Sequence, residues 1–231
     1  MKKLMLPLLV LVFTGSCKKE VTTTVNAENE TTLSSTYAKV NSIPSVTICN
    51  QIWMQKNLDV TTYRNGDPIP QVTNPTAWFT LTTGAWYYYN NDPANGPVYG
   101  KLYNWYAVND PRGLAPAGWH VPSDAEWTTL TDCLGGVTAA GGKLKEKGIK
   151  HWNFPNTNAT NSSRFTALPA GNLNSVDGLF FNKGLLASFW TSTVFSFNAA
   201  YYRRLLYTSG GVGSFGGALS ADGLSVRCVK D

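Results

Sequence analysis

The sequence predicts an α+β domain made of short strands, a few helices and long ordered loops. Aromatic residues make up 13% of the chain and charged residues only 14%, alongside 21 Gly and 12 Pro. Because Gly and Pro favour turns and interrupt helices, this composition is typical of short strands and loops and argues against a helical bundle. Helical spacing occurs in a few central segments, while strand-like segments dominate the second half. A chain of 231 residues suits a single folded domain.

The start of the chain predicts export and lipid attachment. Lys2 and Lys3 precede an apolar run over residues 4–13, which is too short to cross the ~30 Å hydrocarbon of a bilayer as a helix. Small residues then lead directly to Cys17, a pattern that resembles the bacterial lipobox, in which the leader is cut before an acylated cysteine. We therefore expect a signal peptide over 1–16 and a lipidated Cys17. The alternative is an ordinary signal peptide with an incidental cysteine.

Residues 17–42 predict a flexible tether, because they are rich in Thr, Ser and Asn and have no sustained apolar period. The folded domain is expected over 43–231. The formal charge of +5 includes Lys2 and Lys3, and without them 17 basic residues face 14 acidic ones. This small and scattered excess does not indicate a nucleic-acid partner.

In the first half of the domain, residues 45–58 alternate apolar and polar side chains and predict strands. Turn residues then fill much of the chain up to residue 97. Apolar residues at three- and four-residue spacing predict a helix over 98–108. A second helix is expected over 123–133, ended by Gly135 and Gly136, with Cys133 on its buried stripe. A short third helix is expected over 139–147.

The second half predicts mostly strands and loops. Five strand candidates, separated by Gly, Ser and Asn turns, cover residues 165–173, 178–182, 187–195, 199–207 and 224–231. Residues 210–223, between the last two, are rich in glycine and are expected to form a turn region. Their spacing does not match a phosphate-binding glycine loop.

The run GWHVPSDAEW, residues 118–127, predicts a structural motif at the start of the second helix. Pro122 sets the direction of the chain, and Ser123 with Glu126 three residues later matches a capping box. Trp119 and Trp127 would add buried aromatic area on either side of the cap. The motif is thus expected to be scaffolding.

The alternative for the same run is a catalytic site in which His120 acts as a base oriented by Asp124 or Glu126. We favour scaffolding, because the cap already uses Glu126 and no nucleophile of distinctive context is nearby. His151 beside Trp152 is the other possible seed of a site. The prediction is therefore a non-enzyme without catalytic residues.

Three cysteines lie in the predicted domain, namely Cys49, Cys133 and Cys228. An odd number allows at most one internal disulfide and leaves one thiol over. The sequence has no CxxC motif and only two histidines, so we expect no metal site and no cofactor.

The segments YGKLYNWYAV, PAGWHVPSDAEW, ASFWTSTV and LSVRCVKD resemble, in order and spacing, the Fibrobacter succinogenes major paralogous domain (FISUMP). This resemblance covers residues 43–231 and implies an exported bacterial protein, often a lipoprotein of the Bacteroidetes or Fibrobacteres, with no established molecular function. GWHVPSDAEW is also similar to a motif of the formylglycine-generating, sulfatase-modifying enzymes. That similarity implies a C-type-lectin-like domain with a short twisted antiparallel sheet, two main helices and long loops.

The sequence departs from these families at several points. Leu114-Ala115 and Tyr87 stand where the FISUMP family carries cysteines, so Cys228 lacks its usual partner. Cys133 could replace that partner only if the second helix lies against the last strand. The three cysteines do not match the copper-binding pair of the formylglycine enzymes, and the calcium motifs of sugar-binding lectins are missing.

We therefore expect an outer membrane lipoprotein, on the periplasmic or the cell-surface face, whose membrane partner is reached through Cys17. Its domain is expected to serve binding or adhesion, with polysaccharide as the candidate ligand. Exposed aromatic rings stack on sugars, and the alternative is that these rings belong to the core. Two other hypotheses are a structural envelope protein that binds other proteins and an extracytoplasmic enzyme. The candidate ligand-binding rings are those of Trp78, Trp86, Tyr87, Tyr88 and Tyr89.

Overall fold

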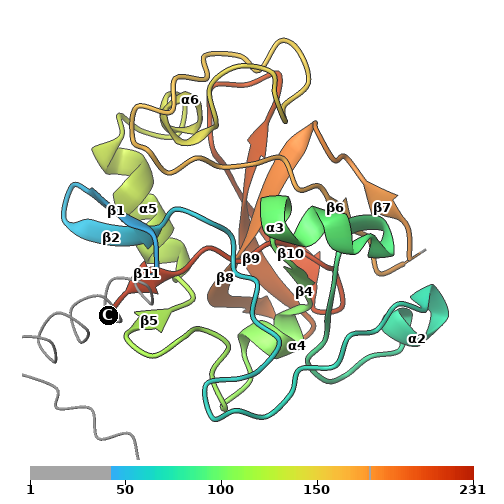
Figure 1. Ribbon diagram of the computed structural model, residues 1–231. Helices are drawn as coiled ribbons and strands as arrows, with labels where there is room; N and C mark the ends of the chain where they lie inside the picture. Colours follow the sequence, from blue (N-terminus) through green and yellow to red (C-terminus); the bar gives the residue numbers. More distant parts are fainter. Residues whose placement is uncertain (1–42, 177) are drawn as a thin grey trace, which may run out of the picture. The chain divides into compact units, whose positions relative to one another are not determined.

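The computed structural model describes residues 43–176 and 178–231 (Figure 1). The predicted signal peptide 1–16, Cys17 and the tether 17–42 lie outside the described residues. The described chain is a mixed α and β structure with mostly strands, few and short helices, and small antiparallel sheets, as the sequence predicted. Within these residues no helix is long and apolar enough to cross a membrane.

Regular elements are short and are joined by long loops. The strands are β1 (Ser45–Ile48), β2 (Gln51–Met54), β3 (Trp86–Tyr87), β4 (Leu102–Tyr103), β5 (Trp119–His120), β6 (Asn172–Leu173), β7 (Phe180–Phe181), β8 (Leu186–Ser196), β9 (Ala199–Leu206), β10 (Gly213–Leu219) and β11 (Val229–Lys230). The helices are α2 (Pro75–Phe79), α3 (Gly96–Tyr99), α4 (Trp105–Val108), α5 (Asp124–Cys133) and α6 (Ala140–Leu144), with 3-10 turns at Tyr89–Asn91 and Pro93–Asn95.

The two ends of the described domain meet in one sheet. This four-stranded sheet has the order β1-β2-β11-β5, so the last strand lies between the first hairpin and the strand that carries His120 (Figure 1). Val229 is opposite both Trp53 and His120 in the register. A second, three-stranded sheet has the order β10-β9-β8 and contains the longest strands.

Helix α5 forms where the sequence predicted it. The Ser123 hydroxyl accepts a hydrogen bond from the Glu126 amide, and the Glu126 carboxylate accepts one from the Ser123 amide, which completes the capping box. Trp127, Leu130 and Leu134 are buried at helical spacing. Cys133 was expected on this stripe, but it is exposed and Leu134 takes the inward position, because the stripe drifts around the helix.

The predicted helix over 98–108 is wrong. The segment instead forms α3, the short strand β4 and α4. Gly100 has φ 72°, and a β-carbon there would lie 2.7 Å from the Leu58 carbonyl oxygen, so the break is built from a glycine conformation and a close approach of backbone. Leu102 and Tyr103 then pair with β3, and Asn104 caps α4. Most of the apolar residues whose spacing predicted one helix are instead buried separately in α3, β4 and α4.

Two further expectations need correction. The glycine-rich segment 210–223 contains strand β10, which pairs with β9 along an antiparallel register that shifts between Phe215 and Ala218. The third helix shortens to α6, whose Gly141 packs so closely that a β-carbon would collide with the Gly211 carbonyl. Of the strand candidates, 187–195 and 199–207 match β8 and β9, whereas the other three contain only two-residue strands.

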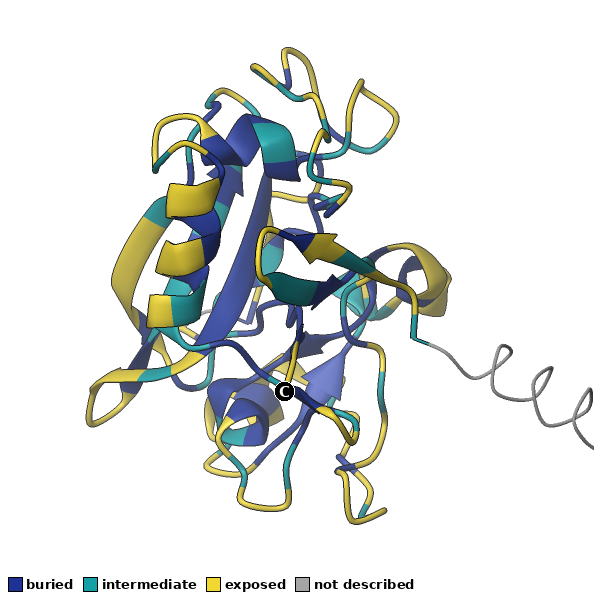
Figure 2. Ribbon diagram, turned by 90° about the vertical axis from the view of Figure 1, so that its left-hand side faces the viewer, coloured by how far each residue is buried: buried dark blue, intermediate teal, exposed yellow. Residues whose placement is uncertain are grey.

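The core is aromatic and lies between α5 and the two larger sheets (Figure 2). Trp53 lies 4.9 Å from Trp127 between ring centroids, and Phe165 lies 5.7 Å from each of them. Phe189 of β8 closes this cluster at 5.4 Å from Trp127. Tilted and edge contacts of this kind add to the large apolar area that each ring buries.

A disulfide joins Cys49 to Cys133, and Cys228 is a buried free thiol. Cys49 lies in the turn between β1 and β2, so the bond ties this hairpin to the carboxyl end of α5. A Cys133–Cys228 bond is excluded, because Cys228 lies inside the core while Cys133 is exposed at the end of its helix.

Replacing Cys49 and Cys133 together by Ser should lower the free energy of unfolding by about 2–4 kcal/mol, because the bond closes a loop with a sequence separation of 84. Urea unfolding followed by tryptophan fluorescence measures this loss. A non-reduced peptide map is the companion measurement, and a Cys133–Cys228 peptide in it would contradict the assignment.

Candidate functional site

Most of the aromatic run that the sequence singled out lies inside the domain. Trp78, Trp86 and Tyr87 are buried, and the rings of Trp78 and Tyr87 stack with 4.1 Å between centroids. Their ring faces are therefore not open to a ligand, which corrects the expectation for these three residues. The physical reason is that β3 pairs with β4 and packs on both sides, so neither of its alternating faces meets solvent.

The rings of Trp86 and Tyr88 pack against the ammonium group of a buried lysine, Lys101. Lys101 Nζ lies 4.5 Å from the Trp86 ring centroid and 4.9 Å from that of Tyr88. The same ammonium pairs with the Asp59 carboxylate and donates to the Asp59 carbonyl at 2.8 Å. Tyr88 and Tyr89 are half-buried, and the Tyr89 ring lies 5.5 Å from Lys183 Nζ.

His120 touches two carboxylates. Its Nε2 lies 2.7 Å from Glu126 Oε1, and its Nδ1 lies 2.7 Å from Asp231 Oδ1. Glu126 thus serves the helix cap through one oxygen and the imidazole through the other, so the expectation that the cap would occupy it fully is corrected. Because a carboxylate only accepts, both ring nitrogens must donate, which requires the protonated imidazolium.

The pKa values follow from this geometry. Burial lowers the pKa of His120, but the hydrogen bonds to Asp231 and Glu126 outweigh it and the pKa is raised. Burial raises the pKa of Glu126, but hydrogen bonds from Ser123 and His120 outweigh it and the pKa is lowered. A general base needs a free nitrogen lone pair, and this ring has none while both contacts are made.

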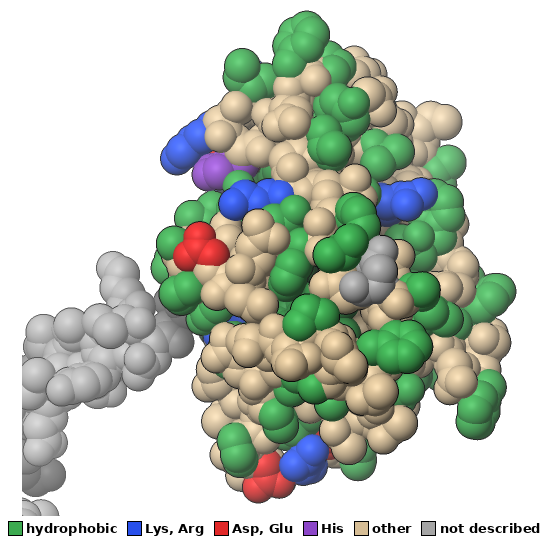
Figure 3. Space-filling model, turned by 90° about the vertical axis from the view of Figure 1, so that its right-hand side faces the viewer, with side chains coloured by type: hydrophobic (Ala, Val, Ile, Leu, Met, Phe, Trp, Pro, Cys, Tyr) green, Lys and Arg blue, Asp and Glu red, His purple; other side chains and the backbone are tan. Residues whose placement is uncertain are grey.

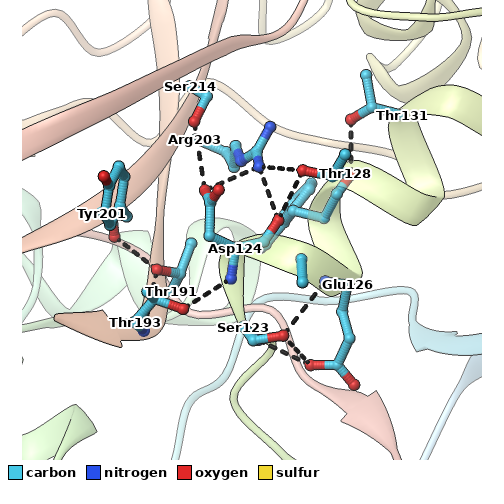
Figure 4. Close-up of polar contacts among 12 residues, drawn as sticks. Ser123, Asp124, Glu126, Thr128, Thr131, Thr191, Thr193, Tyr201, Arg203 and Ser214 are labelled. Carbon is cyan, nitrogen blue, oxygen red and sulfur yellow. Dashed lines mark hydrogen bonds and ion pairs between the residues drawn. The ribbon is translucent and has the colours of Figure 1, made fainter. Parts of the chain in front are cut away.

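Asp124, the other carboxylate considered as an orienting group, serves a different network (Figure 4). Its Oδ1 lies 2.8 Å from Arg203 Nη2 on β9, and the same nitrogen donates to the Asp124 carbonyl at 2.7 Å. Its backbone amide donates to Thr193 Oγ1 of β8 at 3.0 Å. These contacts fasten the start of α5 to the three-stranded sheet.

His151 also has a carboxylate partner. Its Nδ1 lies 2.8 and 2.9 Å from the two carboxylate oxygens of Glu146. Its ring packs in a T-shaped arrangement with the Tyr99 ring, with 5.8 Å between the ring centroids. Among the residues that the structure describes, no group of three His, Cys, Asp or Glu side chains is placed to hold a metal ion.

The outer face of β9 and β10 carries an open site that sequence analysis did not identify. Two cavities of about 350 and 200 Å³ lie on it, and Arg204 lines both. The Arg204 guanidinium lies 4.2 Å from the Phe215 ring centroid, and that ring stacks with Tyr202 at 5.5 Å. The smaller cavity also presents the side chains of Asn172 and Asn182.

Arg204 differs from Arg203, the neighbouring cation of β9, in making no ion pair. Nowhere in residues 43–176 and 178–231 does a carboxylate lie within 4 Å of its guanidinium, whereas Arg203 pairs with Asp124. We refer to Arg204, Tyr202, Phe215, Asn172 and Asn182 as the sheet site.

The comparison with protein families decides the relationship of this chain. A family model described as Fibrobacter succinogenes major domain (Fib_succ_major) matches residues 46–230. The chain belongs to this family. Searches of curated proteins and of solved structures gave no match. Membership suggests a surface or envelope protein and assigns no molecular activity. The distant similarity to sulfatase-modifying enzymes and the C-type-lectin-like fold stay predictions.

In this Fib_succ_major domain, one sequence signal could have indicated the sheet site. In a strand over 199–207 successive side chains point to opposite faces, which places Tyr202 and Arg204 on one face and Arg203 on the other. Which face is open depends on where α5 packs, and α5 covers the Arg203 side. The contributions of Asn172 and Asn182 come from a separate hairpin and give no local signal.

His120→Gln should reduce the free energy of unfolding by about 0.5–1 kcal/mol near pH 6, a range set by the solvent screening of half-exposed pairs. The folded pKa of His120 is raised, so its stabilising contribution is complete below the unfolded value and is lost as the pH rises through the folded value. The difference between variant and parent should therefore shrink by pH 9.

Urea unfolding at several pH values between 5 and 9 measures this difference. Asp231→Asn serves as the matched variant, since it leaves the Glu126 contact in place and should give a smaller loss of the same sign. Parallel stability profiles for His120→Gln and the parent would show that the ring is not held as an imidazolium.

Proposed function

We propose that this chain is an exported, lipid-anchored protein of the bacterial envelope whose domain binds polysaccharide without catalysis. Family membership supports an envelope protein. The leader pattern before Cys17 supports export and anchoring in the outer membrane, facing the periplasm or the cell surface. His120 has a carboxylate at each ring nitrogen, which supports a role for this residue without acid–base chemistry.

The sheet site carries the binding proposal. Carbohydrate hydroxyls need planar donors and acceptors beside an apolar surface, and the site combines a guanidinium, two amides and a tyrosine with the Phe215 ring. Arg204 has no acidic partner in the described chain, so its guanidinium can pair with ligand oxygens without breaking an ion pair. The candidate aromatic surface thus moves from residues 78–89 to β9 and β10.

The charge distribution supports a neutral polymer. Figure 3 shows the side of the domain that carries β6 and β7 in Figure 1, and this side is mostly apolar and neutral polar, with few charged side chains. Such a surface lacks the dense positive charge that a nucleic acid requires.

A protein partner is the second candidate, and one observation favours it. The turn between β8 and β9 projects Phe197 with 97% of its surface exposed, beside Phe195 at 51% and Val194 at 55%. Exposed apolar groups of this kind often mark protein contacts. Loss of crosslinking to envelope proteins in a Phe195→Ser/Phe197→Ser variant, with polysaccharide binding retained, would separate the two candidates.

Metabolic labelling with a radioactive fatty acid should mark the wild-type protein and leave Cys17→Ser unlabelled. The expected reason is that Cys17 is the acylated residue after removal of 1–16. Cys49→Ser is the control and should keep its label. Equal labelling of Cys17→Ser, or an unlabelled wild type in its native envelope, would contradict the anchor.

Pull-down on cellulose, chitin and peptidoglycan tests the binding proposal. We expect retention on at least one of these polymers, and Arg204→Gln should weaken it at least tenfold, which corresponds to about 1.4 kcal/mol. Arg164→Gln is the matched control, because Arg164 is exposed and lies outside the sheet site. Folding of each variant is checked by thermal unfolding.

Absence of retention on all three polymers by the folded wild type would overturn the polysaccharide proposal. Equal retention of Arg204→Gln and wild type would overturn the placement at the sheet site.

A further inference from the structure

Another cavity, which shares no lining residue with the two cavities of the sheet site, has a cationic lining. It measures about 350 Å³ and opens between the segment after β2, helix α3 and residues 150–151. Lys56, Lys150 and Arg227 contribute positive charge, His151 lies beside them, and no Asp or Glu is among the lining residues. Pro44, Pro97, Val98 and Leu168 contribute apolar groups to the rest of the lining, and Gln55, Asn57 and Thr166 contribute neutral polar ones.

Arg227 is fully buried and is bound only by neutral acceptors. Its Nε and Nη2 donate to Asn57 Oδ1 at 3.0 and 2.6 Å, and its Nη1 donates to the carbonyls of Met54 and Phe165 at 3.0 and 2.6 Å. Its guanidinium lies 4.4 Å from the Phe165 ring centroid. In the part of the chain that the structure describes, no carboxylate lies within ion-pair distance of this guanidinium.

The Arg227 guanidinium is therefore fixed by hydrogen bonds, but no carboxylate neutralises its charge. Burial lowers the pKa of Arg227 to about 9, so the group still carries its charge at neutral pH. A buried charge normally has an opposite partner, because transfer from water is costly. Glu146 is engaged through both carboxylate oxygens with His151 of the cavity lining.

The two lysines at the rim are also unpaired. Lys56 and Lys150 are exposed, and neither makes an ion pair with any described residue. Together with Arg227 they surround a concave volume with positive charge on one side and apolar side chains on the other. An anion bound there would lie near three positive charges, and its binding would break no ion pair of the described residues.

We propose that this cavity binds a small organic anion through a carboxylate group, with Lys56 and Lys150 as its ion-pair partners and Arg227 as the buried charge behind them. The apolar wall favours an organic molecule over an inorganic ion. The volume of about 350 Å³ is at the lower end of ligand cavities, so it suits a molecule the size of one sugar acid. This inference uses no residue of the sheet site and does not rest on the proposed function.

Isothermal titration calorimetry of the full protein with D-galacturonate tests the proposal. D-galactose is the matched neutral probe and should bind at least tenfold more weakly. The double variant Lys56→Gln/Lys150→Gln should lose at least tenfold in affinity, and binding should weaken as sodium chloride is raised. Because both lysines are exposed, this variant avoids the folding cost of changing Arg227.

Lys147→Gln/Lys230→Gln is the control variant, with the same charge change outside the cavity and no expected effect. Arg204→Gln should also leave galacturonate binding unchanged, so a failure here is distinct from a failure at the sheet site. Equal binding of galactose, unchanged affinity in Lys56→Gln/Lys150→Gln, or tighter binding of inorganic phosphate than of galacturonate would each overturn the proposal.

Discussion

The fold depends on side-chain donors that satisfy buried carbonyl groups of its long loops. Regular elements are too short to pair most of the backbone, and an unpaired buried carbonyl costs free energy. Indole and cationic side chains supply the donors. Five indole N–H groups donate to backbone carbonyls, those of Trp78, Trp86, Trp105, Trp152 and Trp190. The cations that do so are the buried Lys101, Lys145, Arg203 and Arg227, together with the exposed Arg64.

This use of donors explains why a chain with little charge is rich in tryptophan. Each of these indoles buries apolar surface and donates a hydrogen bond to one backbone carbonyl of a loop. It thus replaces part of the hydrogen bonding that longer helices and strands would provide. Lys145 is the strongest case, because its ammonium donates to three carbonyls, those of Thr157, Leu206 and Ser209. Burial lowers the pKa of Lys145 to about 8. Arg204 and Lys56 do not serve the fold in this way, and they are among the residues that we propose contact ligands.

Helix α5 is held at both ends to the sheet that joins the chain's first and last strands. At its start, Glu126 links the cap to His120 of β5, and His120 in turn contacts Asp231 beyond β11. At its end, Cys133 is bonded to the turn between β1 and β2. Glu126 and His120, the residues of the catalytic alternative, thus also attach the start of α5 to this sheet.

The sequence by itself determined the features that depend on neighbours a few residues apart. The cap at Ser123 and Glu126 requires only a three-residue spacing, and β8 and β9 are runs rich in aromatic or β-branched residues between turn residues, so both were predictable. The tertiary structure alone decided the pairing of Cys49 with Cys133, the break at Gly100 and the burial of Trp78 and Tyr87. Each of these depends on which distant segment packs alongside, and local composition carries no information about that partner. The openness of the face with Tyr202 and Arg204 has the same cause, since only the position of α5 on the opposite face of the sheet leaves it uncovered.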